Sequence, residues 1–208
     1  MVSTMARTPA PGARDRILDN AARLFSEHGI HAVGLQQVID ECGCGKNLLY
    51  REFSSKDDLV VAYLERCRAD WWSMITEAIA TCPDDPAAQL MAIVRRVAEE
   101  VDVPDFRGCA FLNTHAEFPD ADHPAHLMSV EHLTAVRALL HDLATRAGAR
   151  DPVVLADRLA LILDGLNANA AVLGRTGAAS EAVAFADDVI RAALPPPPKR
   201  RARPTVRP

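Results

Sequence analysis

Aromatic residues are scarce in this chain, and no apolar run approaches the length of a membrane-spanning helix. Phe, Trp and Tyr together make up 5% of the 208 residues. Runs of β-branched residues are short, which disfavours a β-sheet protein. A helix needs about 20 apolar residues to cross a bilayer, and the N-terminal stretch MVSTMARTPAPGARD lacks the apolar core of a secretory signal. We therefore expect a cytoplasmic protein with no membrane partner.

Cysteine is also scarce, and the five present are an odd number scattered along the chain. A chain of this length can bury a core without disulfide bonds, so we expect reduced thiols. Cys42 and Cys44 stand close together, but a metal site needs further ligands, and no C-x-x-C or H-x-x-x-H pattern lies nearby. The segment RGCAFLNTHAEFPDADHP leaves a metal cluster of Cys109, His115 and His123 open beside a short helix and polar loop. We favour the helix and loop, and expect no metal and no cofactor.

What the chain does have is apolar residues at helical spacing. Apolar residues make up 49% and charged residues 25%, which is enough for a packed core. Asp151-Pro152 is a typical helix start, and Ser55 stands three residues before Asp58 as in a capping box. No strand and no internal repeat is evident. The expected helices span 14–28, 35–42, 46–53, from 56 to a break at 82–86, about 90–101, 109–118, from a loop at 119–124 to about 147, 152–173, and from a cap at Ser180 to 194. The sequence thus predicts an all-α fold of about nine helices.

Two of the short helices form a recognisable pair. The helix 35–42 and the helix that starts after Gly45 are joined by Gly43-Cys44-Gly45, a tight turn that favours a helix-turn-helix. In that arrangement the second helix, here KNLLYRE, enters the major groove of DNA. Cys42 and Cys44 then fit as small buried hydrophobic residues of the turn. We prefer this interpretation to a metal or thiol-sensing site.

The surrounding sequence carries a family resemblance. Ile17, Ala21, Leu24, Phe25 and Gly29 match the signature of the first helix, and a second signature consists of Gly43, Leu49, Tyr50, Phe53, Lys56 and Leu59. Over residues 14–64 the chain resembles the DNA-binding domain of the TetR family of transcriptional regulators. The resemblance implies a three-helix DNA-binding domain followed by a helical ligand-binding and dimerisation domain. Beyond residue 64 the chain resembles the family only in length and helix count.

The candidate DNA-binding residues follow from the motif and from side-chain chemistry. Lys46 and Asn47 open the recognition helix, Leu48 is suited to a thymine methyl group, and Arg51 is suited to guanine or phosphate. Tyr50 and Lys56 resemble the family residues that contact the DNA backbone, and helix N-termini offer N–H groups to phosphate. The full set is Gly34, Leu35, Gly45, Lys46, Asn47, Leu48, Tyr50, Arg51 and Lys56.

Three residues depart from the family pattern. Gly45 stands where Ser or Thr usually caps the recognition helix, and glycine costs only a few tenths of a kcal/mol there. Leu48 stands where Thr or Ser is common. Glu52 brings a carboxylate to a position near the DNA backbone, where it would repel phosphate. Residues 14–56 are also nearly neutral overall. We therefore expect binding to depend on a few placed contacts and on a dimer.

The rest of the chain supplies candidates for the two roles that the resemblance implies there. Large apolar side chains and a few polar anchors suggest a ligand pocket, with candidates Trp71, Met74, Phe111, His115, Phe118, Met128 and Asn167. The last two helices are expected to pair with their copies in a second subunit through Leu159, Ile162, Leu163, Leu166, Ala170, Ala186, Val189 and Ile190. Packing within the chain is the alternative for every member of both sets.

These observations divide the chain into four parts. They are a flexible N-terminus at 1–13, a helix-turn-helix DNA-binding domain at 14–60, a ligand-binding and dimerisation domain at 61–194, and a Pro-rich basic tail at 195–208. The tail carries five basic residues from Lys199 onward, and we favour a solvated segment over a nucleic-acid contact. We expect a non-enzymatic, homodimeric repressor that a small apolar or amphipathic effector releases from a palindromic operator.

Alternatives remain open at this point. One is an activator or a regulator without a ligand. The other is a helical small-molecule-binding protein or enzyme that no longer binds DNA specifically. No nucleophile elbow or phosphate loop supports catalysis.

Overall fold

The computed structural model describes residues 12–103, 106–174 and 177–196. Within these ranges the chain forms nine α-helices and no strand, which confirms the expected all-helical fold. The helices are α1 (Ala13–His28), α2 (Leu35–Cys42), α3 (Lys46–Glu52), α4 (Lys56–Ala80), α5 (Pro86–Glu100), α6 (Ala110–Glu117), α7 (Pro124–Arg146), α8 (Pro152–Leu173) and α9 (Ala178–Ala193). The expected flexible N-terminus and basic tail lie almost wholly outside the described residues.

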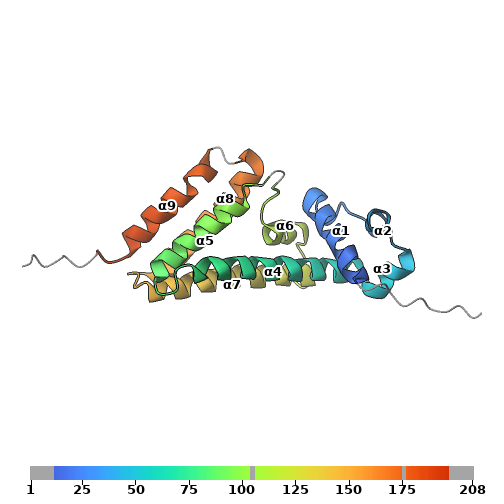
Figure 1. The fold of residues 1–208 in the computed structure, drawn as a ribbon, viewed down its shortest axis with the longest axis horizontal. Helices are drawn as coiled ribbons and strands as arrows, with labels where there is room; N and C mark the ends of the chain where they lie inside the picture. Colours follow the sequence, from blue (N-terminus) through green and yellow to red (C-terminus); the bar gives the residue numbers. More distant parts are fainter. Residues whose placement is uncertain (1–11, 104–105, 175–176, 197–208) are drawn as a thin grey trace, which may run out of the picture.

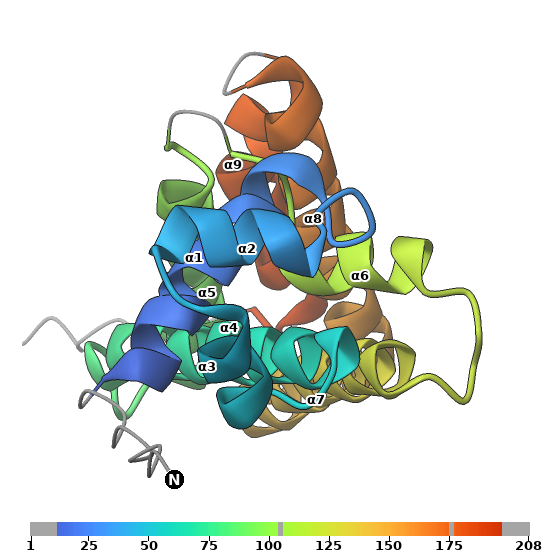
Figure 2. The ribbon, with the colours of Figure 1, turned by 90° about the vertical axis from the view of Figure 1, so that its right-hand side faces the viewer.

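The long helix α4 connects the two parts of the molecule (Figure 1). It is 25 residues long, and α1, α2 and α3 gather at its N-terminal end. α7 runs alongside α4, while α5, α8 and α9 complete the C-terminal helical domain. Figure 2 looks onto the end formed by α1–α3 and shows α6 beside them, above α7. We refer to α1–α3 with the first part of α4 as the helix-turn-helix domain.

Two hydrophobic cores underlie this division. The first fills the helix-turn-helix domain and includes Ile17, Leu49 and Leu59, none of which has exposed surface. The second lies among α4, α5, α7, α8 and α9. Phe111 and Phe118, at the two ends of α6, belong to the first core although the helix lies in the C-terminal part of the chain. α6 is therefore, with α4 and the start of α7, one of the elements through which the two parts share buried surface.

The helix boundaries follow from local capping chemistry. The side chains of Asp85 and Asp151 accept hydrogen bonds from backbone N–H groups in the first turns of α5 and α8, and a proline follows each cap. Ser55 caps α4 by accepting from the Asp58 N–H at 3.0 Å, as its spacing predicts. The expected cap at Ser180 is wrong. Gly177 precedes α9, and the Ser180 hydroxyl donates back to the Gly177 carbonyl from within the first turn.

α8 is long and largely apolar, with seven buried residues along its length. It packs between α7 and α9 and supplies much of the second core. Among the described residues, no helix combines the length and apolar character needed to span a membrane.

Candidate functional site

The helix-turn-helix is built by a glycine turn and a few fully buried side chains. Gly43 ends α2 in the left-handed conformation at φ 60°, which L side chains adopt reluctantly. The turn is closed by hydrogen bonds from the Gly43 and Cys44 N–H groups to the carbonyls of Asp40 and Ile39. Leu49 then anchors the seven-residue α3 in the core of the domain. A helix this short depends on such packing, because its own hydrogen bonds do not stabilise it in water.

Cys42 and Cys44 form a disulfide, so the expectation of reduced thiols is wrong for this pair. The left-handed Gly43 reverses the chain, and the Cα atoms of the two cysteines lie 5.3 Å apart, within the usual range for a disulfide. Cys44 is buried at 9% exposure, as expected for a small residue of the turn. The free cysteines of the described chain are Cys67, Cys82 and Cys109.

The recognition helix presents a polar face to solvent. Gly45, Lys46, Asn47 and Arg51 are exposed, and the Tyr50 side chain is 45% exposed despite its aromatic ring. The Lys46 ammonium lies 5.8 Å from the centre of the Tyr50 ring, within cation–π range. A basic group and a phenol thus share one surface of α3, and both can donate hydrogen bonds to phosphate oxygens.

The remaining DNA-binding candidates lie at the starts of the neighbouring helices. Gly34 is exposed and precedes α2 in an extended conformation, so the first N–H groups of this eight-residue helix have no side-chain cap. Leu35 and Leu48 are half-buried and pack against the core of the domain. Lys56 is half-buried at the start of α4, where burial lowers its pKa and the carboxylates of Glu117 and Asp57 oppose the shift.

Glu52, one of the departures from the family pattern, is partly neutralised by its neighbour. Its carboxylate lies 3.6 Å from the Arg51 guanidinium. Its backbone carbonyl accepts from the Arg14 guanidinium at 2.7 Å, and Arg14 also covers the Phe53 ring at 4.2 Å. Arg51 therefore has a carboxylate beside it and is not simply a free donor for a base or phosphate.

Glu117, at the end of α6, connects the C-terminal domain to the helix-turn-helix domain. Its carboxylate accepts hydrogen bonds from the backbone N–H groups of Ile30 and His31, at 3.0 and 2.6 Å. Gly29 makes the close approach possible: its φ is 87°, and a Cβ there would lie 3.3 Å from a Glu117 carboxylate oxygen. The His31 ring also packs on Phe118, with ring centres 4.6 Å apart. We call this set of interactions the α6 contact.

A cavity of about 160 Å³ lies at the N-terminal end of α6, in the C-terminal domain. Four of the seven ligand-binding candidates line it, namely Trp71, Met74, Phe111 and Asn167. The other three lie elsewhere: His115 is exposed with its ring against His126, Phe118 belongs to the α6 contact, and Met128 packs on the first core. The wall of the cavity also includes Cys67, Val97, Glu100, Phe106, Gly108, Cys109, Ala110 and His132.

His132 is the residue of this cavity that the sequence reasoning missed. It is buried on α7, stacked on Phe111 with ring centres 3.7 Å apart, and it meets the Trp71 ring edge-on at 5.2 Å. The spacing of His132 from other residues of α7 could have indicated that it is buried. Ser129, His132 and Leu140 fall on one buried face of α7, whereas the apolar Leu127 is 54% exposed.

The segment weighed as a metal cluster does not bring its three residues together. Cys109 lines the cavity, His115 faces His126, and the His123 ring stacks on Phe118 and caps α7 by accepting from the Ala125 N–H. Among the residues described, no group of three or more His, Cys, Asp or Glu side chains is arranged to hold a metal ion.

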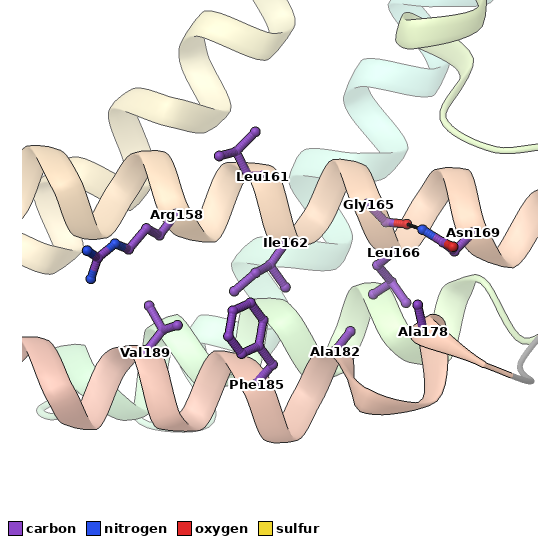
Figure 3. Close-up of a pocket in the computed structure, with 10 residues that line it drawn as sticks. All are labelled: Arg158, Leu161, Ile162, Gly165, Leu166, Asn169, Ala178, Ala182, Phe185 and Val189. Atoms are coloured by element: carbon purple, nitrogen blue, oxygen red, sulfur yellow. Dashed lines mark hydrogen bonds between the residues drawn. The ribbon is translucent and has the colours of Figure 1, made fainter.

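The dimer candidates on α8 and α9 divide into two groups. Five of them are buried inside the protomer and do not line the groove between these helices: Leu159, Leu163, Ala170, Ala186 and Ile190. Ile162, Leu166 and Val189 line that groove, which has a volume of about 530 Å³. Figure 3 shows Ile162 and Leu166 of α8 facing Phe185 and Ala182 of α9 across the gap between the helices, with Val189 on the same helix as Phe185. Leu161 and Phe185, at 72% and 58% exposure, are the large apolar residues of the groove that sequence reasoning missed.

Known proteins match both parts of the chain. Residues 17–63 match the family model described as "Bacterial regulatory proteins, tetR family". A crystal structure of a TetR-family transcriptional regulator from Streptomyces coelicolor is 32% identical, with a TM-score of 0.83 over 87% of this chain and 95% of that one. The transcriptional repressor ComR of Escherichia coli is 28% identical over 81% of this chain and 82% of its own length. The transcriptional activator FasR of Mycolicibacterium smegmatis is 34% identical, over only 38% of this chain and 36% of its own.

The similarity to the Streptomyces protein extends over nearly the whole chain, including the C-terminal helices that the family model does not reach. This chain has a helix-turn-helix with an exposed recognition helix, followed by a second, helical domain. Relatives over most of the chain are transcriptional regulators, not enzymes. This chain belongs to the TetR family and is a DNA-binding transcriptional regulator.

Proposed function

We propose that this protein is a homodimeric, cytoplasmic repressor that binds a palindromic operator and is released by a small effector. In this proposal residues 14–60 bind DNA, and residues 61–194 hold the effector and the dimer interface. The observation that carries it is the position of α6. Phe111 on this helix lines the cavity, and Glu117 on its last turn hydrogen-bonds the α1–α2 loop of the helix-turn-helix domain.

The DNA-binding part of the proposal rests on the exposed face of α3 and on the start of α2. Lys46, Asn47, Tyr50 and Arg51 provide donors for base edges and phosphates. Lys56 at the start of α4 and the N–H groups that follow Gly34 are suited to phosphate. One such helix covers only a few base pairs, and so a second copy of the chain, reading the matching half-site, would give useful specificity.

The groove between α8 and α9 supports the dimer. Leu161 and Phe185 expose large apolar surface beside Ile162 and Val189, and buried apolar surface is the main driving force of stable association. Arg158 lies at the edge of the groove and provides a polar rim. A second copy related by two-fold symmetry would bring the same four apolar residues against this face.

Release by an effector would operate through α6. In this mechanism a molecule in the cavity contacts the Phe111 ring and shifts it, and α6 carries that movement to Glu117 at its other end. The α1–α2 loop, which Glu117 holds through Ile30 and His31, would then shift the recognition helices out of step with successive major grooves. The effector does this only if it binds the released conformation more tightly than the DNA-bound one.

The experiment that tests this proposal couples the two sites. Operator binding is followed by fluorescence anisotropy while small apolar and amphipathic molecules are added. We expect at least one class of molecule to lower operator affinity without dissociating the dimer. If molecules that demonstrably bind the protein leave operator affinity unchanged, the effector-controlled part of the proposal is wrong.

A further inference from the structure

His132, in the wall of the cavity, has a buried polar atom that lacks a partner among the described residues. His132 is 3% exposed, and its Nδ1 atom has no hydrogen-bond partner within the described part of the chain. Most buried side-chain nitrogens in native proteins have a hydrogen-bond partner, and an exception calls for an explanation, of which a bound molecule is one. The ring cannot easily turn towards solvent, because Phe111 stacks on one of its faces and Trp71 abuts it.

The histidine is neutral near pH 7. Burial, and to a smaller extent the positive charge of Arg68, lower the pKa of His132 to about 4. Arg68 itself lies 3.5 Å from the Glu131 carboxylate on the outside of α7. A neutral imidazole has one N–H donor and one acceptor nitrogen. It therefore suits an uncharged polar group on a ligand, such as a hydroxyl or a carbonyl.

The rest of the cavity wall is largely apolar, with Asn167 and Glu100 as exceptions. Trp71, Met74, Val97, Phe106 and Phe111 provide rings and aliphatic surface. Cys67 and Cys109 are uncharged thiols, because burial raises the pKa of both, that of Cys67 to about 11. The acidic residue of the wall is Glu100, which pairs with Arg96 at 3.0 Å, and none of the described residues that line the cavity is a lysine or arginine that would attract an anionic ligand.

The size of the cavity limits the ligand further. Its volume is about 160 Å³, and an apolar cavity of roughly this volume accommodates benzene. We infer that the cavity binds a neutral, single-ring aromatic molecule that carries one hydroxyl or carbonyl group, which hydrogen-bonds to the imidazole of His132. This inference rests on the proposal that the cavity is the effector site, and it names the chemical class of that effector.

The test compares phenol, toluene and benzoate, which share one ring and differ in the substituent. Their binding to the full-length protein is measured by calorimetry in the absence of DNA. We expect phenol to bind about tenfold more tightly than toluene, as one buried hydrogen bond implies, and benzoate to bind more weakly than phenol. Equal affinities for phenol and toluene, or tighter binding of benzoate, would overturn the inference.

Variants at position 132 show whether the histidine is the cause. His132→Phe preserves the stacking and removes the ring nitrogens, so phenol and toluene should bind this variant with about equal affinity. His132→Gln should retain part of the preference, and it serves as a second variant if His132→Phe does not fold. The matched control His141→Phe, at an exposed histidine of the same helix, should keep the full preference. A full preference in His132→Phe, or an undiminished preference in His132→Gln, contradicts the assignment.

The outcomes also separate this inference from the proposed function. If phenol binds as expected but does not weaken operator binding, then the ligand class is correct and the effector role of the cavity is wrong. If another class of molecule releases the operator while phenol and toluene bind alike, then the proposed function stands and the inference about ligand class is wrong.

Discussion

Glu117 contacts His31 through both its side chain and its main chain. Its carboxylate accepts the His31 backbone N–H at 2.6 Å, and its carbonyl oxygen lies 2.8 Å from Nε2 of the His31 ring. The two residues are 86 positions apart in sequence and belong to different domains. Charge-assisted hydrogen bonds of this kind are stronger than neutral ones. The pair therefore ties the position of the α1–α2 loop to the position of α6.

The first prediction concerns this contact. Glu117→Ala removes the acceptor for two backbone N–H groups, and the two domains should lose their coupling. We expect the operator affinity to stay within about tenfold of the wild-type value. The decrease in operator affinity that an effector causes should be less than half of the wild-type decrease, as measured by anisotropy titrations. The control Glu181→Ala alters an exposed carboxylate on α9 and should leave the response intact. A full effector response in Glu117→Ala would show that the signal takes another route.

The second prediction concerns the groove between α8 and α9. Phe185→Asp puts a charge on exposed apolar surface, so the protomer should still fold but the dimer should dissociate. Light scattering after size-exclusion chromatography is expected to give the mass of one chain for this variant and of two for the wild type. Leu127→Asp makes the same type of change at an exposed leucine on α7 and should remain dimeric. A dimeric Phe185→Asp would place the interface elsewhere.

The third prediction concerns the cysteines. Without reductant, the unfolded chain should react with a thiol reagent at three positions, and after reduction at five, because Cys42 and Cys44 are bonded to each other. Closing so short a loop stabilises a protein by only about 1.5 kcal/mol on the chain-entropy account. Reduction should thus lower the melting temperature by about 3–6 °C and leave the helix content unchanged. Five reactive thiols before reduction would disprove the bond.

The fourth prediction follows from the pKa of His132. In the folded protein burial lowers this pKa to about 4, against about 6.5 in the unfolded chain. Between these pH values only the unfolded state gains the proton, so the free energy of unfolding should decrease as the pH falls from about 6.5 to about 4. Urea unfolding at pH 7 and pH 4.5 measures the loss, which should be smaller in His132→Phe. An identical loss in both proteins would mean that His132 titrates normally in the folded state.

Much of the fold was predictable because its signals are local. Asp151-Pro152 starts a helix wherever it occurs in a suitable context, and Gly43 predicts the turn because few other residues tolerate its backbone angles. The exposed face of α3 followed from the same motif. These features depend on residues within one or two helical turns of one another.

The features that escaped prediction depend on which side of a helix meets which neighbour. α8 is apolar on most of its surface, so sequence alone could not tell the buried Leu159 from the exposed Leu161. From its residue type His132 would be assigned to the surface, and only knowledge of which face of α7 is buried corrects this. The disulfide required the three-dimensional path of the turn, since general arguments about chain size and cysteine number favour free thiols.

The most direct test of the account is sequence-specific DNA binding by the exposed face of α3. Genomic fragments that the protein retains in the presence of excess unrelated DNA are selected, and the affinity of the wild type is compared with that of Tyr50→Ala and Lys46→Ala by fluorescence anisotropy. Both side chains are exposed, so the variants should fold normally. We predict a palindromic site occupied by two subunits or a multiple of two, with affinity lowered about tenfold or more in each variant. Selection of no common sequence, or equal affinity in all three proteins, would contradict the account.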